Sequence, residues 1–238
     1  MTVTTAGTLR SRILAALGGV RDPELDEPIT VLGFVASCTV DSDGQAEVHL
    51  RLPTYFCAPN FAYLMVADAY DAVSALDGVR RADVILDEHF AAAAINQGVA
   101  ARAGFVGSFG AEAAGELDAL RADFLRKAVL AGTDQVCRPL AAAGATPDDL
   151  AATTLGEVPD TPALARLRRR RAELGLPAGD GAPLVIDPGS GTGVGAAAVP
   201  LHLRRARLTR TSLEANTGIC RGMLRHRYQI DPEAEDES

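Results

Sequence analysis

The sequence predicts an α+β fold: a small domain with the order helix, strand, strand, helix, strand and a three-stranded sheet, followed by a mainly helical extension. Three observations carry this prediction. Apolar residues recur at helical spacing in residues 8–17 and 61–76, apolar and polar residues alternate in residues 46–52, and turn-forming residues separate these segments. Beyond residue 88 alternation gives way to alanine-rich stretches that are typical of helices.

The first three elements form a helix and a hairpin. A helix is predicted over Thr8–Leu17, and the two glycines that follow end it. Ile29–Val40 is predicted as a strand, and the turn formers Asp41–Gly44 follow it directly. Ala46–Leu52 places its apolar residues on one face, so we expect a half-buried strand that pairs with the preceding one.

The next two elements complete the small domain. A loop beginning at Pro53 leads into a helix over Phe61–Leu76, and Val79–Leu86 is predicted as the third strand. The elements of the extension are predicted from the spacing of its apolar residues and from a capping pattern near its end. It is predicted to contain helices over 91–103, 113–131, 161–174 and 211–228, strands over 184–186 and 199–208, and a glycine-rich loop over 188–195.

These elements predict three parts of the chain. Residues 1–88 form the small domain, residues 89–230 form the mainly helical extension, and the acidic residues 231–238 form a disordered tail.

Composition excludes several classes of protein. The net charge of −8 argues against a general nucleic-acid binder. The four cysteines are widely spaced and contain no CxxC pair, which favours free thiols in a reducing cytoplasm. We find no signal-peptide pattern and no apolar run of membrane-spanning length, so we expect a cytoplasmic protein without a membrane partner.

Cys57 is the first candidate for chemistry. It lies in the loop between a predicted strand and a predicted helix, close to the helix N-terminus. The backbone N–H groups and the dipole at that end stabilise anions, so the thiolate is favoured, and the thiolate is the form that binds iron or sulfur. The alternative is a small apolar side chain packed in the core, because free cysteine is often buried.

Asp22 and Glu24 are the second candidate. They flank a proline in the turn after the first helix. Their carboxylates can bind a metal ion, or they can simply accept hydrogen bonds that close the turn.

These features occur in the order of a known family. The run Val20–Leu25 contains Asp-Pro-Glu-Leu, Leu32–Val35 reads Leu-Gly-Phe-Val, Thr54–Cys57 forms the loop, and Gly78–Leu86 begins with Gly-Val and ends in an apolar strand. Together they resemble the PaaD-like and SufT-like metal–sulfur cluster assembly family over about residues 9–87.

The resemblance implies an iron–sulfur cluster assembly or iron-delivery factor that matures a client iron enzyme or works with the assembly machinery, and that is not itself an enzyme. It implies metal ligation by Cys57, with Asp22, Glu24 and Thr54 around it, and iron or a cluster bound transiently, with no nucleotide. One departure from the family pattern is Ala58, which stands where a proline usually follows the cysteine.

One cysteine cannot hold a cluster alone, because clusters normally take four ligands. Cys137, Cys220 or His89 can add ligands, two chains can pair as a homodimer, or the client can complete the site. Two other classes stay open. The domain can be a protein-interaction adaptor for a metalloenzyme with no metal of its own, or Cys57 can be an enzymatic nucleophile, although no histidine is placed beside it by sequence.

Overall fold

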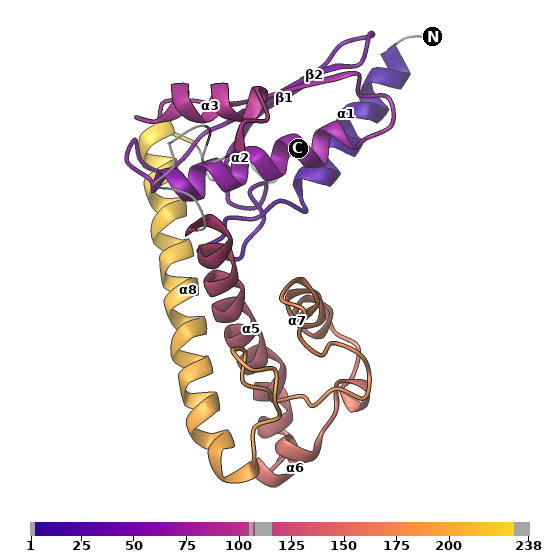
Figure 1. Ribbon diagram of the computed structural model, residues 1–238, viewed down its shortest axis with the longest axis vertical. Coiled ribbons are helices and arrows are strands. Elements are labelled where there is room, and N and C mark those ends of the chain that lie inside the picture. The colour runs from indigo at the N-terminus through magenta and orange to yellow at the C-terminus, as the bar shows by residue number, and fades with distance from the viewer. Residues whose placement is uncertain (1–2, 105–106, 108–115, 231–238) are drawn as a thin grey trace. The chain divides into compact units, whose positions relative to one another are not determined.

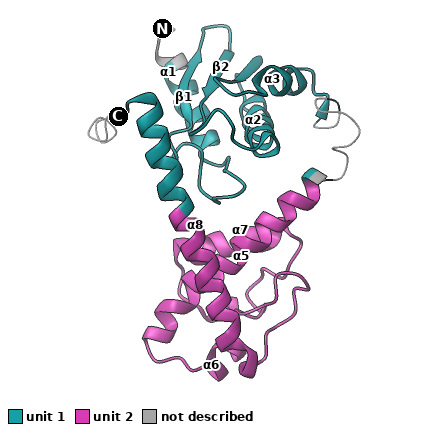
Figure 2. Ribbon diagram, turned by 90° about the vertical axis from the view of Figure 1, so that its left-hand side faces the viewer, with its two compact units in different colours: residues 1–117, 216–238 teal, residues 118–215 magenta. Residues whose placement is uncertain are grey.

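The computed structural model describes residues 3–104, 107 and 116–230, and residues 231–238, predicted as a disordered tail, lie outside them. The chain divides into two compact units (Figures 1 and 2). The first contains residues 1–117 and 216–238, and the second contains residues 118–215. The first unit thus includes α3 (Ala92–Ala100) and the end of α8 (Val199–Tyr228), in addition to the small domain predicted from the sequence.

The first unit has the predicted α+β order. It runs α1 (Val3–Leu17), β1 (Val35–Val40), β2 (Gln45–Leu50), α2 (Pro59–Ser74) and β3 (Arg81–Leu86). The three strands form one sheet in the order β1-β2-β3. β1 and β2 are antiparallel, as the predicted hairpin requires, whereas β2 and β3 are parallel and are connected through α2.

One strand is shorter than the sequence predicts. Ile29–Leu32 is a turn rather than the start of β1, because the Leu32 N–H bonds to the Pro28 carbonyl at 3.0 Å. Gly33 follows with φ 76°, a left-handed conformation that favours glycine and takes the chain out of the strand direction. The strand therefore begins only at Val35.

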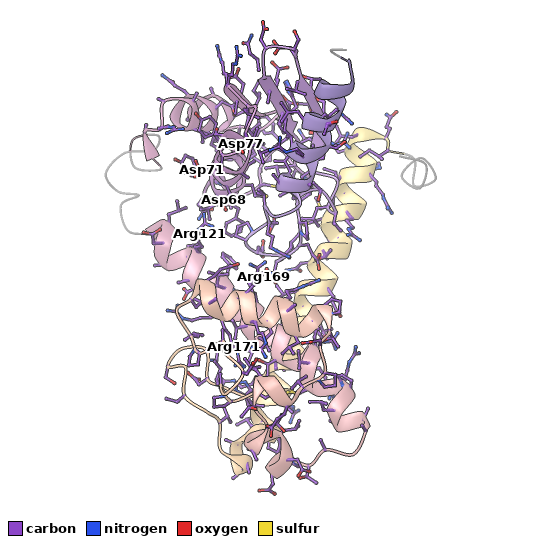
Figure 3. All side chains as sticks on the ribbon, turned by 90° about the vertical axis from the view of Figure 1, so that its right-hand side faces the viewer. Asp68, Asp71, Asp77, Arg121, Arg169 and Arg171 are labelled. Atoms are coloured by element: carbon purple, nitrogen blue, oxygen red, sulfur yellow. The ribbon has the colours of Figure 1, made fainter. Side chains whose placement is uncertain are left out.

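The second unit is helical apart from isolated bridges. It contains most of α5 (Glu116–Ala142), then α6 (Pro147–Ala152), η2 (Leu155–Glu157), α7 (Pro162–Glu173), η3 (Ala196–Ala198) and the first half of α8. Arg171 of α7, labelled in Figure 3, is fully buried, and its guanidinium donates to the Pro183 and Leu184 carbonyls. Burial lowers the pKa of Arg171 to about 10, so the side chain stays charged at neutral pH.

Two strand predictions in this unit are wrong. Residues 199–208 form the beginning of α8, and the capping pattern at residues 211–214 lies inside that helix. The Glu214 carboxylate forms an ion pair with the Arg210 guanidinium at 2.6 Å instead of capping the start of a helix. Residues 184–186 form no strand; Ile186 makes only an isolated bridge to Gly193.

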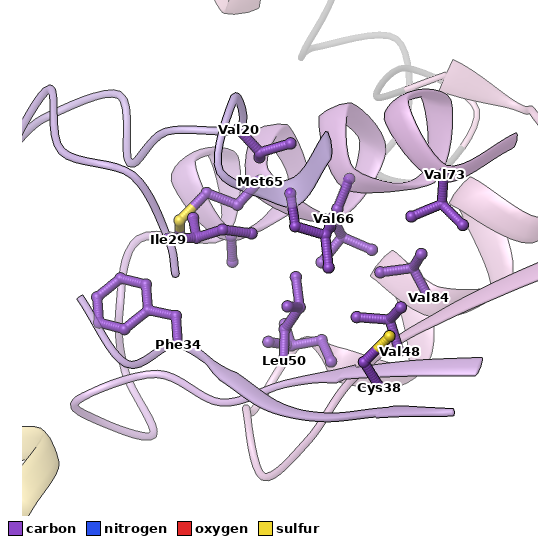
Figure 4. Packing of buried hydrophobic residues seen from close by; sticks show 14 of the residues in the cluster. Val20, Ile29, Phe34, Cys38, Val48, Leu50, Met65, Val66, Val73 and Val84 are labelled. Carbon is purple, nitrogen blue, oxygen red and sulfur yellow. The ribbon is translucent and has the colours of Figure 1, made fainter. Parts of the chain in front are cut away.

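The core of the first unit lies between the sheet and its helices (Figure 4). Val48 and Leu50 of β2, Val84 of β3 and Cys38 of β1 point toward Val66 of α2 and its neighbours. Because side chains alternate along a strand, the opposite face of the sheet is polar. In the described residues, no helix is both long enough and apolar enough to cross a membrane.

Candidate metal–sulfur site

Cys57 lies in the loop that follows β2, as predicted. The loop ends at Ala58, the N-cap of α2, and Pro59 occupies the first turn of the helix. Proline is favoured there because it lacks the N–H that would otherwise be unsatisfied, and its fixed φ starts the helix. Cys57 is half-buried and is a free thiol. Its position one residue before the N-cap places it at the positive end of the helix dipole.

Thr54 holds the sulfur of Cys57. The Thr54 hydroxyl lies 3.3 Å from the Cys57 sulfur, and its oxygen also accepts the N–H of Phe56 at 3.2 Å. An ionised sulfur can only accept, so in that state the threonine hydroxyl is the donor. The Thr54 hydroxyl therefore contacts the sulfur and, through the Phe56 N–H, also fixes the turn that carries Cys57.

His89 binds the backbone of the same loop. Its Nε2 donates to the carbonyl oxygen of Cys57 at 2.7 Å, because Nδ1 accepts the N–H of Ala91 at 3.2 Å. The side chain is buried, and both ring nitrogens bond to main-chain groups. The sequence offered His89 as an additional ligand; its ring lies beside the loop but bonds to the Cys57 carbonyl and not to the sulfur. His89 thus positions the loop and is not the base of a cysteine nucleophile.

Asp22 closes the loop after α1. Its carboxylate accepts the N–H groups of Glu24 and Leu25, each at 2.8 Å, and the side chain is buried. Burial raises the pKa of the Asp22 carboxyl to about 6, although the two N–H donors lower it in part. At neutral pH the group is therefore an ionised carboxylate held in a poorly solvated place, with the half-buried Glu24 beside it.

Cys220, near the end of α8, is half-buried in the first unit. Burial, and then the nearby charges of Asp22, Cys57 and Glu24, raise the pKa of the Cys220 thiol to about 11. Cys57 and Cys220 also pack against the same hydrophobic core. Of the two distant cysteines that the sequence offers as additional ligands, Cys220 is the one in the same unit as Cys57.

The end of α8 is fixed to the loops around Cys57. Arg227 donates to the Leu52 carbonyl at 3.2 Å and to the Glu88 carbonyl at 2.8 Å, immediately before Pro53 and His89, respectively. Arg221 donates to the carbonyl of Val31 at 3.1 Å. These bonds connect the helix to the chain segments on both sides of the cysteine loop.

Cys137 belongs to the second unit. It lies inside α5 with 1% of its surface exposed, in the hydrophobic core of that unit. Its pKa is raised to about 12, first by burial and then by the charge of Asp134. These surroundings are those of a packed thiol.

An aromatic patch adjoins the cysteine loop. It consists of Tyr55, Phe56 and Phe90, which are 47%, 76% and 48% exposed. The Phe56 ring lies 5.0 Å from that of Tyr55 and 6.0 Å from that of Phe90, measured between centroids. The N–H of Phe90 also bonds to the Tyr55 carbonyl at 3.2 Å, which ties the two halves of the patch together. Exposed apolar clusters of this kind mark interaction sites.

The first unit holds two half-buried thiols, Cys57 and Cys220, and the carboxylates of Asp22 and Glu24. Thiolates are ligands of iron, whereas carboxylates are ligands of harder cations. Among the side chains that the structure describes, no group of three or more His, Cys, Asp or Glu residues is arranged to hold a metal ion.

The sequence did not identify the residues that secure the end of α8 to the loops around Cys57. Leu224 and Arg227 belong to a helix whose end the sequence predicts. The chain segments that this helix end contacts were not predicted. The spacing of Cys220, Leu224 and Arg227, at i, i+4 and i+7, places them on one helix face and was the available signal. It identifies an inward face but not the surface against which that face packs.

The comparison with protein families agrees with the motif order. Residues 10–84 match a family model described as iron–sulfur cluster assembly protein. The comparison with curated proteins gave no match. Among solved structures, one described as domain of unknown function DUF59 from Bacillus anthracis is 21% identical, with a TM-score of 0.33, over 43% of this chain and 97% of that chain. The family match covers the α1 to β3 region that contains Asp22, Glu24, Thr54 and Cys57.

Proposed function

We propose that this protein, whose residues 10–84 are a domain of the iron–sulfur cluster assembly family, binds iron or a nascent cluster transiently at Cys57 and delivers it to a client iron enzyme. It acts as an accessory factor and not as an enzyme. One observation carries the proposal: the Cys57 sulfur lies 3.3 Å from the Thr54 hydroxyl in the loop that leads into α2.

The surroundings of Cys57 support its role as a ligand. The sulfur lies 3.3 Å from the Thr54 hydroxyl, which can donate to a metal-bound sulfur, and Cys57 precedes the N-cap of α2. Asp22 also supports metal binding, because a buried carboxylate that lowers the stability of the folded protein is typical of functional sites. A bound iron ion would neutralise this local excess of negative charge.

Cys220 supplies a second thiol in this proposal. At pH 7 it carries its proton, and metal binding displaces that proton. A cluster takes four ligands, so the client, or a second copy of the chain, completes the coordination. Incomplete ligation by the carrier makes the cargo labile, as delivery requires.

The aromatic patch supports docking of the client beside the cargo. It lies on the same loop as Cys57, through Tyr55 and Phe56, and on the segment that His89 ties to it. The patch also favours the second candidate function, an adaptor that binds a metalloenzyme without carrying metal. The two functions differ in whether Cys57 is needed for iron binding.

We expect Cys57→Ser to lower the affinity of the full chain for iron by about tenfold or more, because serine replaces a soft sulfur ligand by a hydroxyl. Anaerobic titration with ferrous iron, with and without sulfide, followed by desalting and iron assay, measures the effect. Cys220→Ser should give a smaller loss, and Cys38→Ala and Cys137→Ala, which change buried thiols in the two cores, serve as matched controls.

Wild-type iron affinity in Cys57→Ser would favour the adaptor. In that case Phe56→Ala should still abolish binding to the client, whereas on the carrier proposal Phe56→Ala leaves iron affinity unchanged because the ring contacts no ligand. Loss of iron only in the Cys137 variant would move the metal site to the second unit and contradict the proposal.

A further inference from the structure

The outer edge of the sheet at β3 is open. β3 pairs with β2 on one side only, since the strand order is β1-β2-β3. The N–H of Arg81 bonds to the Gly44 carbonyl and that of Asp87 to the Leu50 carbonyl. In a parallel pair, backbone groups alternate between the two sides of a strand. Residues 82, 84 and 86 therefore direct their N–H and C=O groups away from β2.

One of these three residues is already bonded. The side chain of Asn96, on α3, accepts the N–H of Leu86 at 2.9 Å and donates to the Leu86 carbonyl at 3.1 Å. An adjacent strand would satisfy the same two groups in the same way. Ala82 and Val84 have no such partner in the part of the chain that the structure describes. Within the described residues, four backbone groups thus remain without a hydrogen-bond partner along this edge, in two residues whose side chains are buried in the core.

The open edge forms one wall of a groove. The groove has a volume of about 740 Å³, within the range of ligand pockets, and five consecutive residues of β3, Arg81–Ile85, line it. Tyr70 of α2 and Val99 of α3 are among the residues of the other wall. A wall of five consecutive strand residues favours an extended peptide over a compact ligand.

The charged side chains of the groove favour an acidic partner. Both carboxylates that line it are engaged by neighbours, Asp83 by Arg81 at 2.9 Å and Glu47 by His49 at 3.1 Å. Arg80 and Arg102 also line it, and the guanidinium of Arg102 lies 5.4 Å from the centroid of the Tyr70 ring. The two arginines give the groove a positive excess.

A second copy of this chain fits the edge poorly. Antiparallel pairing of two β3 strands through Ala82 and Val84 would set Asp83 of one copy opposite Asp83 of the other. Like charges at directly opposed positions destabilise a strand pair. The edge is therefore suited to a different strand.

We infer that the groove along β3 binds an extended acidic segment of a partner protein, which adds a fourth strand to the sheet through the backbone groups of Ala82 and Val84. The acidic side chains of the segment lie beside Arg80 and Arg102. This surface consists of residues other than Cys57 and its loop, so the inference does not depend on iron binding.

The test uses the full chain and a fluorescent synthetic peptide of alternating glutamate and valine. Ala82→Pro removes one outward N–H and leaves the β2 ladder intact, because proline is tolerated on the open side of an edge strand. We expect this variant to weaken peptide binding about tenfold, as the loss of a backbone hydrogen bond predicts. Arg102→Glu should weaken binding and reduce its salt dependence, whereas Arg126→Glu, on the exposed surface of α5, should not.

Amide hydrogen exchange supplies a second readout. Peptide addition should protect the N–H groups of Ala82 and Val84, and alternate N-methylation of the peptide should abolish that protection. A lysine–valine peptide should bind more weakly than the glutamate–valine peptide. Absence of binding, or equal binding by the Ala82→Pro variant with no protection at Ala82 and Val84, would overturn the inference. A concentration-dependent dimer that Ala82→Pro abolishes would also overturn it, because the occupant would then be a second copy.

Discussion

Asp22→Asn should raise the unfolding free energy of the protein at pH 7.5 by up to about 3 kcal/mol, and the gain should vanish below about pH 4. The wild-type carboxyl has a pKa of about 6 in the folded protein, against an ordinary value of 3.8, mainly because it is buried. The folded state therefore binds its proton more tightly than the unfolded chain does. Wild-type stability falls as the pH rises from 3.8 to about 6, and the full penalty applies above that range.

Asparagine removes this titration while keeping the turn. Its carbonyl oxygen can still accept the N–H groups of Glu24 and Leu25. Urea unfolding of the full chain between pH 3.5 and 8, followed by circular dichroism, measures the difference between the two proteins. Asp43→Asn changes an exposed carboxylate in the hairpin turn of the same unit and should show no such pH dependence.

If the unfolding free energies of wild type and Asp22→Asn changed in parallel across this pH range, the ionised Asp22 carboxylate would not destabilise the folded protein. On the proposed function the variant should also bind iron more weakly, because it loses a negative charge at the site. A gain in stability with a loss of binding is the expected compromise at a functional residue.

Leu224→Ala should lower the stability of the first unit by about 3 kcal/mol, as is usual for removing a buried leucine side chain. Leu224 is 2% exposed and belongs to the core that also includes the sheet. It lies one helical turn after Cys220, so losing it also loosens the helix face that presents the second thiol. Cys220 should then react faster with a thiol reagent.

Hydrogen exchange of the β2 and β3 amides, together with the rate of Cys220 alkylation, measures both effects. Met223→Ala is the matched control, because Met223 is the adjacent residue on α8 and is 43% exposed. Its effect should stay within about 0.5 kcal/mol. Unchanged alkylation of Cys220 in Leu224→Ala would mean that Leu224 does not secure the end of α8 beside the site.

The fold of the first unit could be predicted because its signals are local. Alternation in residues 46–52 identifies β2, and the turn formers at 41–44 identify the hairpin. The strand predicted from residue 29 was too long, because apolar residues at 29, 32 and 34 are buried in a turn that Gly33 permits. Apolar content alone did not distinguish that turn from a strand.

The beginning of α8 shows why the extension was harder. Val199, Leu201, Leu203 and Leu208 suggest alternation and hence a strand. In the structure Val199 is buried and Leu203 is partly buried, at helical spacing, whereas Leu201 and Leu208 are 64% and 66% exposed. Burial, which decides between the two periods, is set by tertiary packing that the sequence does not display.

The candidate site was likewise predictable only in part. The motif order identified Asp22, Thr54 and Cys57, and the structure shows the contact between Thr54 and Cys57 at 3.3 Å. The sequence offered Cys137 and Cys220 on equal terms, and only the three-dimensional packing places Cys220 against the same core as Cys57 and Cys137 in the core of the other unit. That choice depends on contacts between residues almost two hundred positions apart, such as the bond from Arg221 to Val31.

Iron K-edge X-ray absorption tests the central claim most directly, namely that the Cys57 sulfur is an iron ligand. The full chain is loaded anaerobically with ferrous iron and no sulfide, so that any sulfur bound to iron comes from the protein. We expect sulfur scatterers in the wild type, fewer in Cys57→Ser, and none in the Cys57→Ser, Cys220→Ser double variant. A sulfur signal that is absent from the wild type, or unchanged in Cys57→Ser, would contradict the account.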